Sequence, residues 1–300
     1  MRITDTVLHQ NFINNLAFAT ERLYESETKV LTNKRINKPS DAPVDVMTDL
    51  ALRTKLSEIE QYQRNISQAN TLLQNSESVV SQLVEVFQRL NELSVQGASD
   101  SYGPSDKQSI SYEVNQLLEQ IVNFANNRTE STYIFSGTNS DVAPYVVTRD
   151  ADGEITEVKT AGSAGDIVVV MGENIKMKTN INGQELFEEG ENLFDIAIKL
   201  RDALRDNDTE SVQDQLGRLQ DATEKIINVQ SVVGARVNRL DAAETRAEND
   251  DIIFSEFLSD TEDIDAAEAI MDYQQQLLTM QSSLQAGSRL LYPKLSDFLK

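Results

Sequence analysis

Few side chains in this sequence could perform chemistry, and their spacing does not match a known type of site. Asp150, Asp152 and Glu154 alternate like the start of a calcium-binding loop, but the remaining ligand spacing and the closing glutamate of an EF-hand are absent. Asp152-Gly153 between two β-type runs is typical of a hairpin turn instead. Residues 162–165 (Gly-Ser-Ala-Gly) lack the GK[ST] of a P-loop and the third glycine of a dinucleotide fingerprint, so we expect a loop there.

Histidine and cysteine chemistry is almost excluded by composition. The chain has no cysteine and a single histidine, His9, which has no glutamate three residues before it as a di-iron carboxylate bundle would require. Disulfides, thiol nucleophiles and Cys/His zinc sites are therefore excluded. An enzyme with a carboxylate site hidden in a helical bundle remains a weak alternative. We expect no catalytic residue, no metal site and no cofactor.

The charge balance argues against two classes of partner. The 300 residues include 49 Asp and Glu against 27 Lys and Arg, for a net charge of −22. Such a chain repels nucleic-acid phosphates and anionic lipid surfaces. The sequence also lacks an apolar run of about 18 residues and a recognisable secretory signal peptide. We therefore expect no nucleic-acid partner and no membrane insertion.

Helices are predicted by apolar residues that recur every seven positions. A sustained repeat of this kind keeps one stripe of a long helix against a partner helix, as in a coiled coil or a bundle. Helices near 45 residues would exceed about 60 Å in length. The three tracks are Leu52, Ile59, Ile66, Leu73, Val80 and Phe87; Val212, Leu219, Ile226, Val233, Leu240, Ala247 and Phe254; and Ile270, Leu277, Leu284, Leu291 and Phe298.

Breaks between the helices are equally visible. The prolines in 38–43 and the turn residues in 97–104 interrupt helix formation. Capping boxes at Ser105/Gln108 and Ser259/Glu262 predict the starts of two further helices.

The glycine-rich middle of the chain predicts a different kind of structure. Tyr145–Thr148 and Ile155–Val158 are expected to form a hairpin, and Ile167–Val170 a further strand. The fold class is therefore mainly α: a long antiparallel, coiled-coil helical rod formed by the N- and C-terminal helices, with a small β-rich insertion. The mirrored order of elements predicts that the terminal helices pack together.

Several segments resemble motifs of the bacterial flagellin-like family. Their order and spacing along the chain are also similar to that family. The segments are KRINKPSDAP at 34–43, ELSVQ at 92–96, YIFSGT at 133–138, GARVNRL at 234–240 and LSDTEDID at 258–265. The Pro-Ser-Asp-x-Pro form and the YIFSGT motif resemble the hook-associated protein 3 branch more than filament flagellin.

This resemblance implies a structural protein of the flagellum, extracellular at the junction between hook and filament, and not an enzyme. It implies export through the flagellar type III channel. The implied partners are hook-associated protein 1, flagellin, further copies of the chain in a ring, and a cytoplasmic export chaperone. Filament flagellin and a type III needle-tip-like structural protein are the alternatives.

The resemblance also implies three layers. Residues 1–33 and 266–300 would form the inner terminal helical domain, residues 34–138 and 191–265 the long-helix rod domain, and residues 139–190 the β-rich outer insertion.

Two sets of residues are expected to act in assembly. The ends of the chain carry weakly charged apolar stripes that should pair in the assembled state: Leu8, Phe12, Leu16, Ala19 and Leu23 with Ile270, Leu277, Leu284, Leu291 and Phe298. If the ends pack together, basic residues near the first break meet acidic residues before the last helix. These form a charge-register link of Lys34, Arg35 and Lys38 with Asp260, Glu262 and Asp263.

Overall fold

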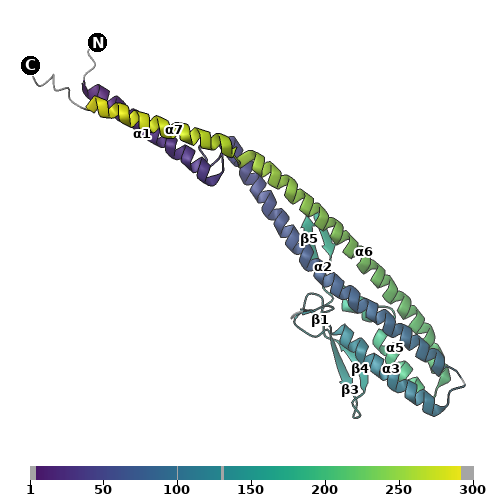
Figure 1. Cartoon of the computed structure of the whole chain (residues 1–300). Coiled ribbons are helices and arrows are strands. Elements are labelled where there is room, and N and C mark those ends of the chain that lie inside the picture. Colours follow the sequence, from purple (N-terminus) through teal and green to yellow (C-terminus); the bar gives the residue numbers. More distant parts are fainter. Residues whose placement is uncertain (1–4, 100, 130–131, 292–300) are drawn as a thin grey trace, which may run out of the picture. The chain divides into compact units, whose positions relative to one another are not determined.

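Two helices are much longer than the rest, α2 (Pro43–Gly97) with 55 residues and α6 (Thr209–Glu262) with 54. The computed structural model describes residues 5–99, 101–129 and 132–291. These ranges form seven helices and six short strands (Figure 1). The predicted mainly α fold with a small β-rich insertion is confirmed.

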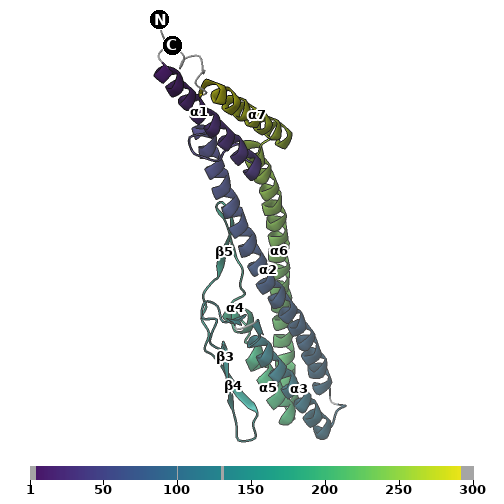
Figure 2. The ribbon, with the colours of Figure 1, turned by 60° about the vertical axis from the view of Figure 1, so that its left-hand side comes forward.

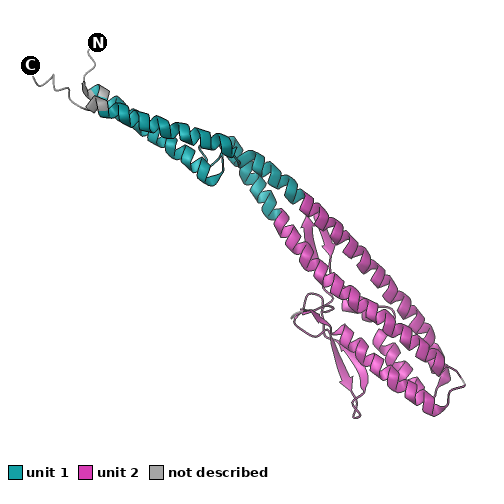
Figure 3. Cartoon of the chain, in the orientation of Figure 1, with its two compact units in different colours: residues 1–58, 250–300 teal, residues 59–249 magenta. Residues whose placement is uncertain are grey.

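The contacts divide the chain into two compact units (Figure 3). Unit 1 comprises residues 1–58 and 250–300, and unit 2 comprises residues 59–249. Helices α2 and α6 contribute residues to both units. Unit 1 also contains α1 (Asp5–Thr32) and α7 (Ala266–Leu291), which lie side by side. The predicted packing of the terminal helices is therefore confirmed within one chain.

In unit 2 the two long helices run antiparallel, side by side (Figures 1 and 2). Asn70 approaches Asp241 at 3.5 Å, and Asn91 donates a hydrogen bond to Thr223 at 3.0 Å. The predicted seven-residue tracks face the interior here. From Ile59 to Phe87 on α2 and from Val212 to Leu240 on α6, every track residue is at most 3% exposed. A stripe with this period stays buried along both helices because seven residues make about two helical turns and so return to nearly the same side.

Three shorter helices and three hairpins complete the described part of unit 2. Helices α3 (Pro104–Ala125) and α5 (Leu193–Arg205) pack against each other. The hairpins are antiparallel pairs of two strands each, and the short helix α4 (Gly183–Phe187) follows the last of them. The strands are β1 (Arg128–Thr129) with β2 (Thr132–Tyr133), β3 (Tyr145–Arg149) with β4 (Ile155–Thr160), and β5 (Val168–Gly172) with β6 (Ile175–Lys178).

The predicted hairpin and the strand after it are confirmed. The turn between β3 and β4 is closed by Asp150, whose carboxylate accepts hydrogen bonds from the backbone of Asp152 and Glu154 at 3.0 and 2.8 Å. The acidic triplet is therefore part of a turn, as expected.

An aromatic cluster attaches the hairpins to the helices. The ring of Tyr145 lies 5.4 Å from Phe187 and 5.0 Å from Phe194, and Phe135 lies 5.5 Å from Phe187. Burial raises the pKa of Tyr145 far above its usual range, with a contribution from nearby Glu188. The buried guanidinium of Arg201 donates to the carbonyl of Ile155 at 2.8 Å and so fixes β4 on α5.

Both predicted capping boxes are wrong. Helix α3 begins at Pro104 after the N-cap Gly103, and Asp106 accepts a hydrogen bond from the Gly103 amide at 3.1 Å. Proline is favoured at the first helical position because it has no N–H to satisfy, so the helix starts before Ser105. Helix α6 continues through Ser259 to Glu262, and Asp265 caps α7 by accepting from the Ala267 amide at 2.8 Å.

Candidate assembly surface

The two terminal helices pack through one stripe of each. On α1, Phe12, Leu16, Ala19 and Leu23 are half-buried and Ser26 is buried. These residues recur at intervals of three and four, so they lie on one face of the helix. Four of them belong to the predicted assembly set. The side chain of Leu8 lies outside the described residues.

The facing stripe of α7 is built partly from small residues. Ala269 and Gly287 are buried, and Tyr273 and Met280 are half-buried. A Cβ atom placed on Gly287 would come within 2.0 Å of Cζ of Phe12. The helices therefore approach closely because residue 287 has no side chain.

Two of the three described side chains of the predicted α7 track are exposed. Ile270 is 45% exposed and Leu284 is 48% exposed, while Leu277 is half-buried. The side chain of Leu291, and Phe298 as a whole, lie outside the described residues. The track is therefore available to surfaces other than α1 in a single chain, and its pairing in the assembled state stays a prediction.

Many large apolar side chains of unit 1 are exposed. Among its described side chains, Ala269 is the only hydrophobic one that is buried. Exposed apolar side chains in this number favour an interaction surface. The large exposed hydrophobic residues of unit 1 are Val7, Ile13, Phe18, Tyr24, Leu31, Val44, Met47, Leu50, Ile252, Ile253, Phe257, Ile270, Met271, Leu278 and Leu284.

The segment after α1 and the end of α6 are joined by a short backbone pairing in unit 1. Asn33 ends α1 in a left-handed conformation with φ of 56°, which asparagine tolerates better than most residues. Lys34 then forms an isolated antiparallel bridge with Asp263, and the Arg35 amide donates to the carbonyl of Glu262 at 2.6 Å.

Part of the predicted charge-register link is formed at this bridge. Lys34 Nζ lies 2.9 Å from Oε1 of Glu262, whose side chain is only 11% exposed. The other carboxylate oxygen of Glu262 accepts from Arg53, which also contacts Asp49 at 2.9 Å. Hydrogen bonds to Asp49 and Glu262 raise the pKa of Arg53 above its ordinary value.

The remaining residues of the predicted link have other contacts. Arg35 pairs with Asp45 at 2.9 Å, and the Lys38 ammonium lies 5.9 Å from the ring centre of Tyr24. Asp263 accepts from the hydroxyl of Ser259. Asp260 forms no ion pair among the described residues.

Sequence reasoning missed Arg53, Asp49, Asp45 and Gly287. The first three lie in α2, and neither their spacing nor the local charge indicated that they meet the ends of α1 and α6. Gly287 carries no apolar signal, so a search for hydrophobic periodicity could not find it.

The described residues form no cluster typical of a metal site and no helix typical of a membrane span. No three His, Asp or Glu side chains in these ranges gather as a metal ion would require. No helix of the described ranges is both long and apolar enough to cross a bilayer.

Family models match both ends of the chain. The bacterial flagellin N-terminal helical region matches residues 3–140, and the bacterial flagellin C-terminal helical region matches residues 216–292. The two matches together cover more than two thirds of the chain.

Individual relatives belong to two kinds of flagellar protein. Flagellar hook-associated protein 3 of Escherichia coli K12 is 23% identical over 95% of this chain and 96% of its own length. The flagellar filament 33 kDa core protein of Treponema phagedenis is 25% identical over 85% of this chain and 83% of its own length. A flagellar hook-associated protein structure from Vibrio parahaemolyticus has a TM-score of 0.66 at 22% identity, covering 74% of this chain and all of that one.

Proposed function

The chain belongs to the bacterial flagellin family, and we propose that it is the structural subunit that joins the flagellar hook to the filament. One observation carries the proposal. Among its described residues, unit 1 fully buries no large apolar side chain, and its terminal segments lie in the regions that match flagellin. Such a surface is stabilised only when further subunits cover it. The near-complete alignment with hook-associated protein 3 favours the junction over other places in the flagellum.

The partners follow from this role. They are hook-associated protein 1 on one side, flagellin on the other, and copies of the chain itself around a ring. We infer in addition an export chaperone in the cytoplasm, passage through the flagellar type III channel, and no enzymatic activity.

The proposed layers follow the sequence segments. Residues 1–33 and 266–300 form the inner layer, residues 34–138 and 191–265 the next, and residues 139–190 face outward. Support for the inner layer comes from α1 and α7, because their uncovered apolar residues need partners to become buried.

A deletion strain tests the junction role. We expect electron microscopy to show hooks without filaments, and flagellin in the culture medium. Plasmid-borne wild-type chain should restore the filaments. Filaments of normal number on the deletion strain would contradict the proposal.

Filament flagellin is a second candidate because the Treponema phagedenis filament protein aligns over most of both chains. A filament subunit would form long filaments when purified and concentrated alone. Its deletion would also remove the filament without leaving another flagellin in the medium. The two roles therefore give different results in both experiments.

A further inference from the structure

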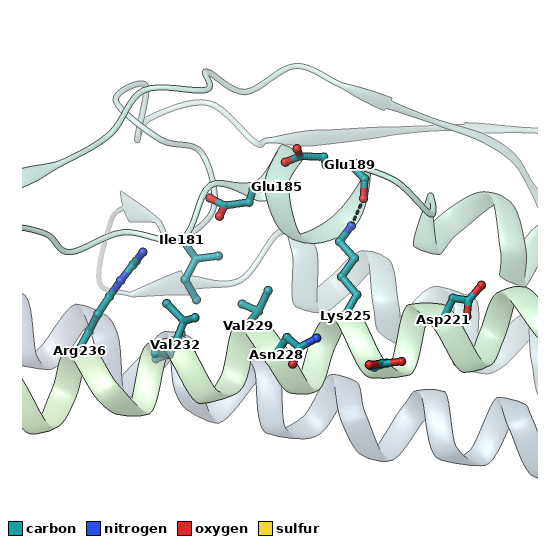
Figure 4. Close-up of a pocket in the computed structure, with 11 residues that line it drawn as sticks. Ile181, Glu185, Glu189, Asp221, Lys225, Asn228, Val229, Val232 and Arg236 are labelled. Atoms are coloured by element: carbon teal, nitrogen blue, oxygen red, sulfur yellow. Dashed lines mark hydrogen bonds between the residues drawn. The ribbon is translucent and has the colours of Figure 1, made fainter.

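A groove with a basic rim lies between β6 and α6 in unit 2. Its volume is about 420 Å³. Its apolar lining is Met177, Val232 and Ala235. Its rim carries four cations, Lys176, Lys178, Arg236 and Arg239. We call it the basic groove. Figure 4 draws a neighbouring pocket, which shares Val232 and Arg236 of α6 with the groove.

Three of the four cations remain available to a partner. Lys178 is held by Asp166 at 2.7 Å and by Glu185 at 3.2 Å. Arg236 donates to the neutral carbonyl of Asn180 at 3.0 Å. Among the described residues, Lys176, Arg236 and Arg239 form no ion pair. The groove therefore suits a partner that presents acidic and apolar groups together.

The chain itself presents such a surface on the part of α6 that belongs to unit 1. Ile252, Ile253, Glu256, Phe257 and Asp260 are all exposed, and their spacing places them on one face of the helix. Ile252 is 64% exposed and Phe257 is 51% exposed. We call these five residues the acidic face.

We propose that the basic groove of one copy receives the acidic face of a second copy. The match is twofold, because the apolar lining meets Ile252, Ile253 and Phe257 while the cationic rim meets Glu256 and Asp260. Copies with a net charge of −22 repel one another, so a contact between them is favoured where cations of one copy meet acids of the next. Both surfaces include α6, and a helix cannot dock onto itself, so the occupant comes from another molecule.

The contact has a consequence for symmetry. It joins two different surfaces, so it is heterologous and leads to rings or helical arrays instead of closed pairs. The inference rests on the proposed function, since it specifies how copies of a junction subunit contact each other.

Cysteine cross-linking of the full chain tests the contact, because the native sequence has no cysteine. One tagged chain carries Ala235→Cys in the groove. The other carries Asn249→Cys, which is exposed and lies one turn before Ile253 on the same helix face. Under mild oxidation we expect a disulfide-linked heterodimer. A Gly217→Cys chain, exposed elsewhere on α6, replaces Ala235→Cys as the positional control and should give little product.

Charge reversal then tests the mechanism. Lys176→Glu with Arg239→Glu in the groove chain should lower the heterodimer yield roughly tenfold, because like charges then face each other. Glu256→Lys with Asp260→Lys in the other chain should restore the yield. Lys159→Glu with Lys199→Glu changes the net charge equally at exposed positions away from the groove, and should leave the yield unchanged. Circular dichroism of each variant checks that the fold is retained.

The outcomes separate this inference from the proposed function. The groove contact is refuted if the heterodimer yield does not fall when the groove charges are reversed. It is also refuted if the second pair of substitutions does not restore the yield. A deletion strain that keeps its filaments overturns the junction role. Loss of filaments on deletion, combined with charge-insensitive cross-linking, refutes the groove contact alone.

Discussion

At residue 287 the missing side chain sets how closely α1 and α7 approach. Because a Cβ there would lie 2.0 Å from Cζ of Phe12, Gly287→Val must displace the aromatic ring. Overpacking of this kind costs about 1–3 kcal/mol. The effect is measurable as disulfide formation between Thr20→Cys and Met280→Cys, whose native side chains lie 3.8 Å apart. We expect the Gly287→Val background to lower the extent of disulfide formation roughly tenfold.

A matched control separates packing from helix propensity. Gly217→Val makes the same substitution in α6, where nothing lies within 4 Å of the new Cβ. It should leave the Thr20–Met280 cross-link unchanged. Equal effects of the two substitutions would show that the close approach of Phe12 is not the cause.

Glu119 and Arg149 give a pH-dependent contact between α3 and β3. Two guanidinium nitrogens of Arg149 reach the carboxylate of Glu119, at 2.5 and 2.9 Å. This contact lowers the pKa of Glu119 below its ordinary value. A carboxylate whose pKa is lowered by folding stabilises the fold at pH values above its ordinary pKa of about 4.3. That stabilisation is lost as the pH falls through the lower pKa of the folded protein.

An NMR titration of the Glu119 side-chain carbonyl carbon checks this expectation. Arg149→Gln should return the pKa of Glu119 toward its ordinary value. Identical titration curves in the two proteins would show that Arg149 does not hold the carboxylate in solution.

At the scale of elements, the seven-residue tracks of α2 and α6 form the core of unit 2. Leu73 is completely buried at the centre of one track. We expect Leu73→Ala to lower the free energy of unfolding by about 2–5 kcal/mol, because a cavity remains where the side chain was. Urea denaturation followed by circular dichroism measures it. Leu52→Ala removes the same atoms from a half-buried position in unit 1 and should cost clearly less.

The long helices were predictable because their partners lie within the same chain. A period of seven requires a facing helix, and in unit 2 the tracks of α2 and α6 supply each other with one. The seven-residue apolar track of α7, in contrast, did not predict which face of α7 contacts α1. That side uses Ala269 and Gly287, whose small size permits close approach but adds little to a hydrophobic pattern.

Short elements and helix starts were predicted less well for local reasons. Strands β1 and β2 have two residues each, too few for an alternating pattern to be recognised. The start of α3 was misplaced because Pro104 outweighs the capping signal of Ser105. The link around Glu262 was only partly predictable, since Arg53 reaches it from a distant part of the sequence.

Helices α1 and α7 should differ between the free and the assembled protein. In a single chain they bury few apolar side chains, and a helix pair with so little burial is marginally stable. We therefore expect fast amide exchange in α1 and α7 of the free monomer and strong protection in the assembled state. Exchange in the core stretch of α2 from Ile59 to Phe87 serves as the internal reference and should be slow in both. Strong protection of α1 and α7 in the monomer would contradict the expectation.

At the scale of the whole molecule, the two units differ in how much apolar surface each buries. Unit 2 has its own core of long tracks, aromatic rings and a buried Arg201, whereas unit 1 has Ala269 as its one buried hydrophobic residue among the described side chains. Apolar surface that a chain cannot cover by itself provides free energy for association when copies meet. The net charge of −22 opposes association between copies, so contacts between opposite charges would be favoured wherever copies meet.

The charge-register link is therefore expected to act as a set. Any one exposed pair contributes at most about 1 kcal/mol, so single substitutions of Arg35 or Lys38 should leave assembly almost unchanged. Reversing Lys34, Arg35 and Lys38 together to Glu places like charges beside Glu262 and should impair attachment of filaments, scored by electron microscopy of complemented deletion strains.

A compensating variant tests whether paired opposite charges, and not the basic charges alone, are needed for filament attachment. The compensating variant reverses Glu262 and Asp263 to Lys and leaves Asp260 unchanged, because Asp260 belongs to the acidic face. Both strains that are compared carry Arg53→Gln, because Arg53 would face a new lysine at position 262 and a glutamate there would lie beside Asp49. If opposite charges set the register between the segment after α1 and the end of α6, the combined variant should attach filaments far better than the basic-side reversal alone. If these residues are only a solvated basic turn and an acid-rich helix end, restoring opposite charges should bring no recovery. Equal filament counts in the two strains would therefore refute the charge-register link while leaving the packing of α1 on α7 unaffected.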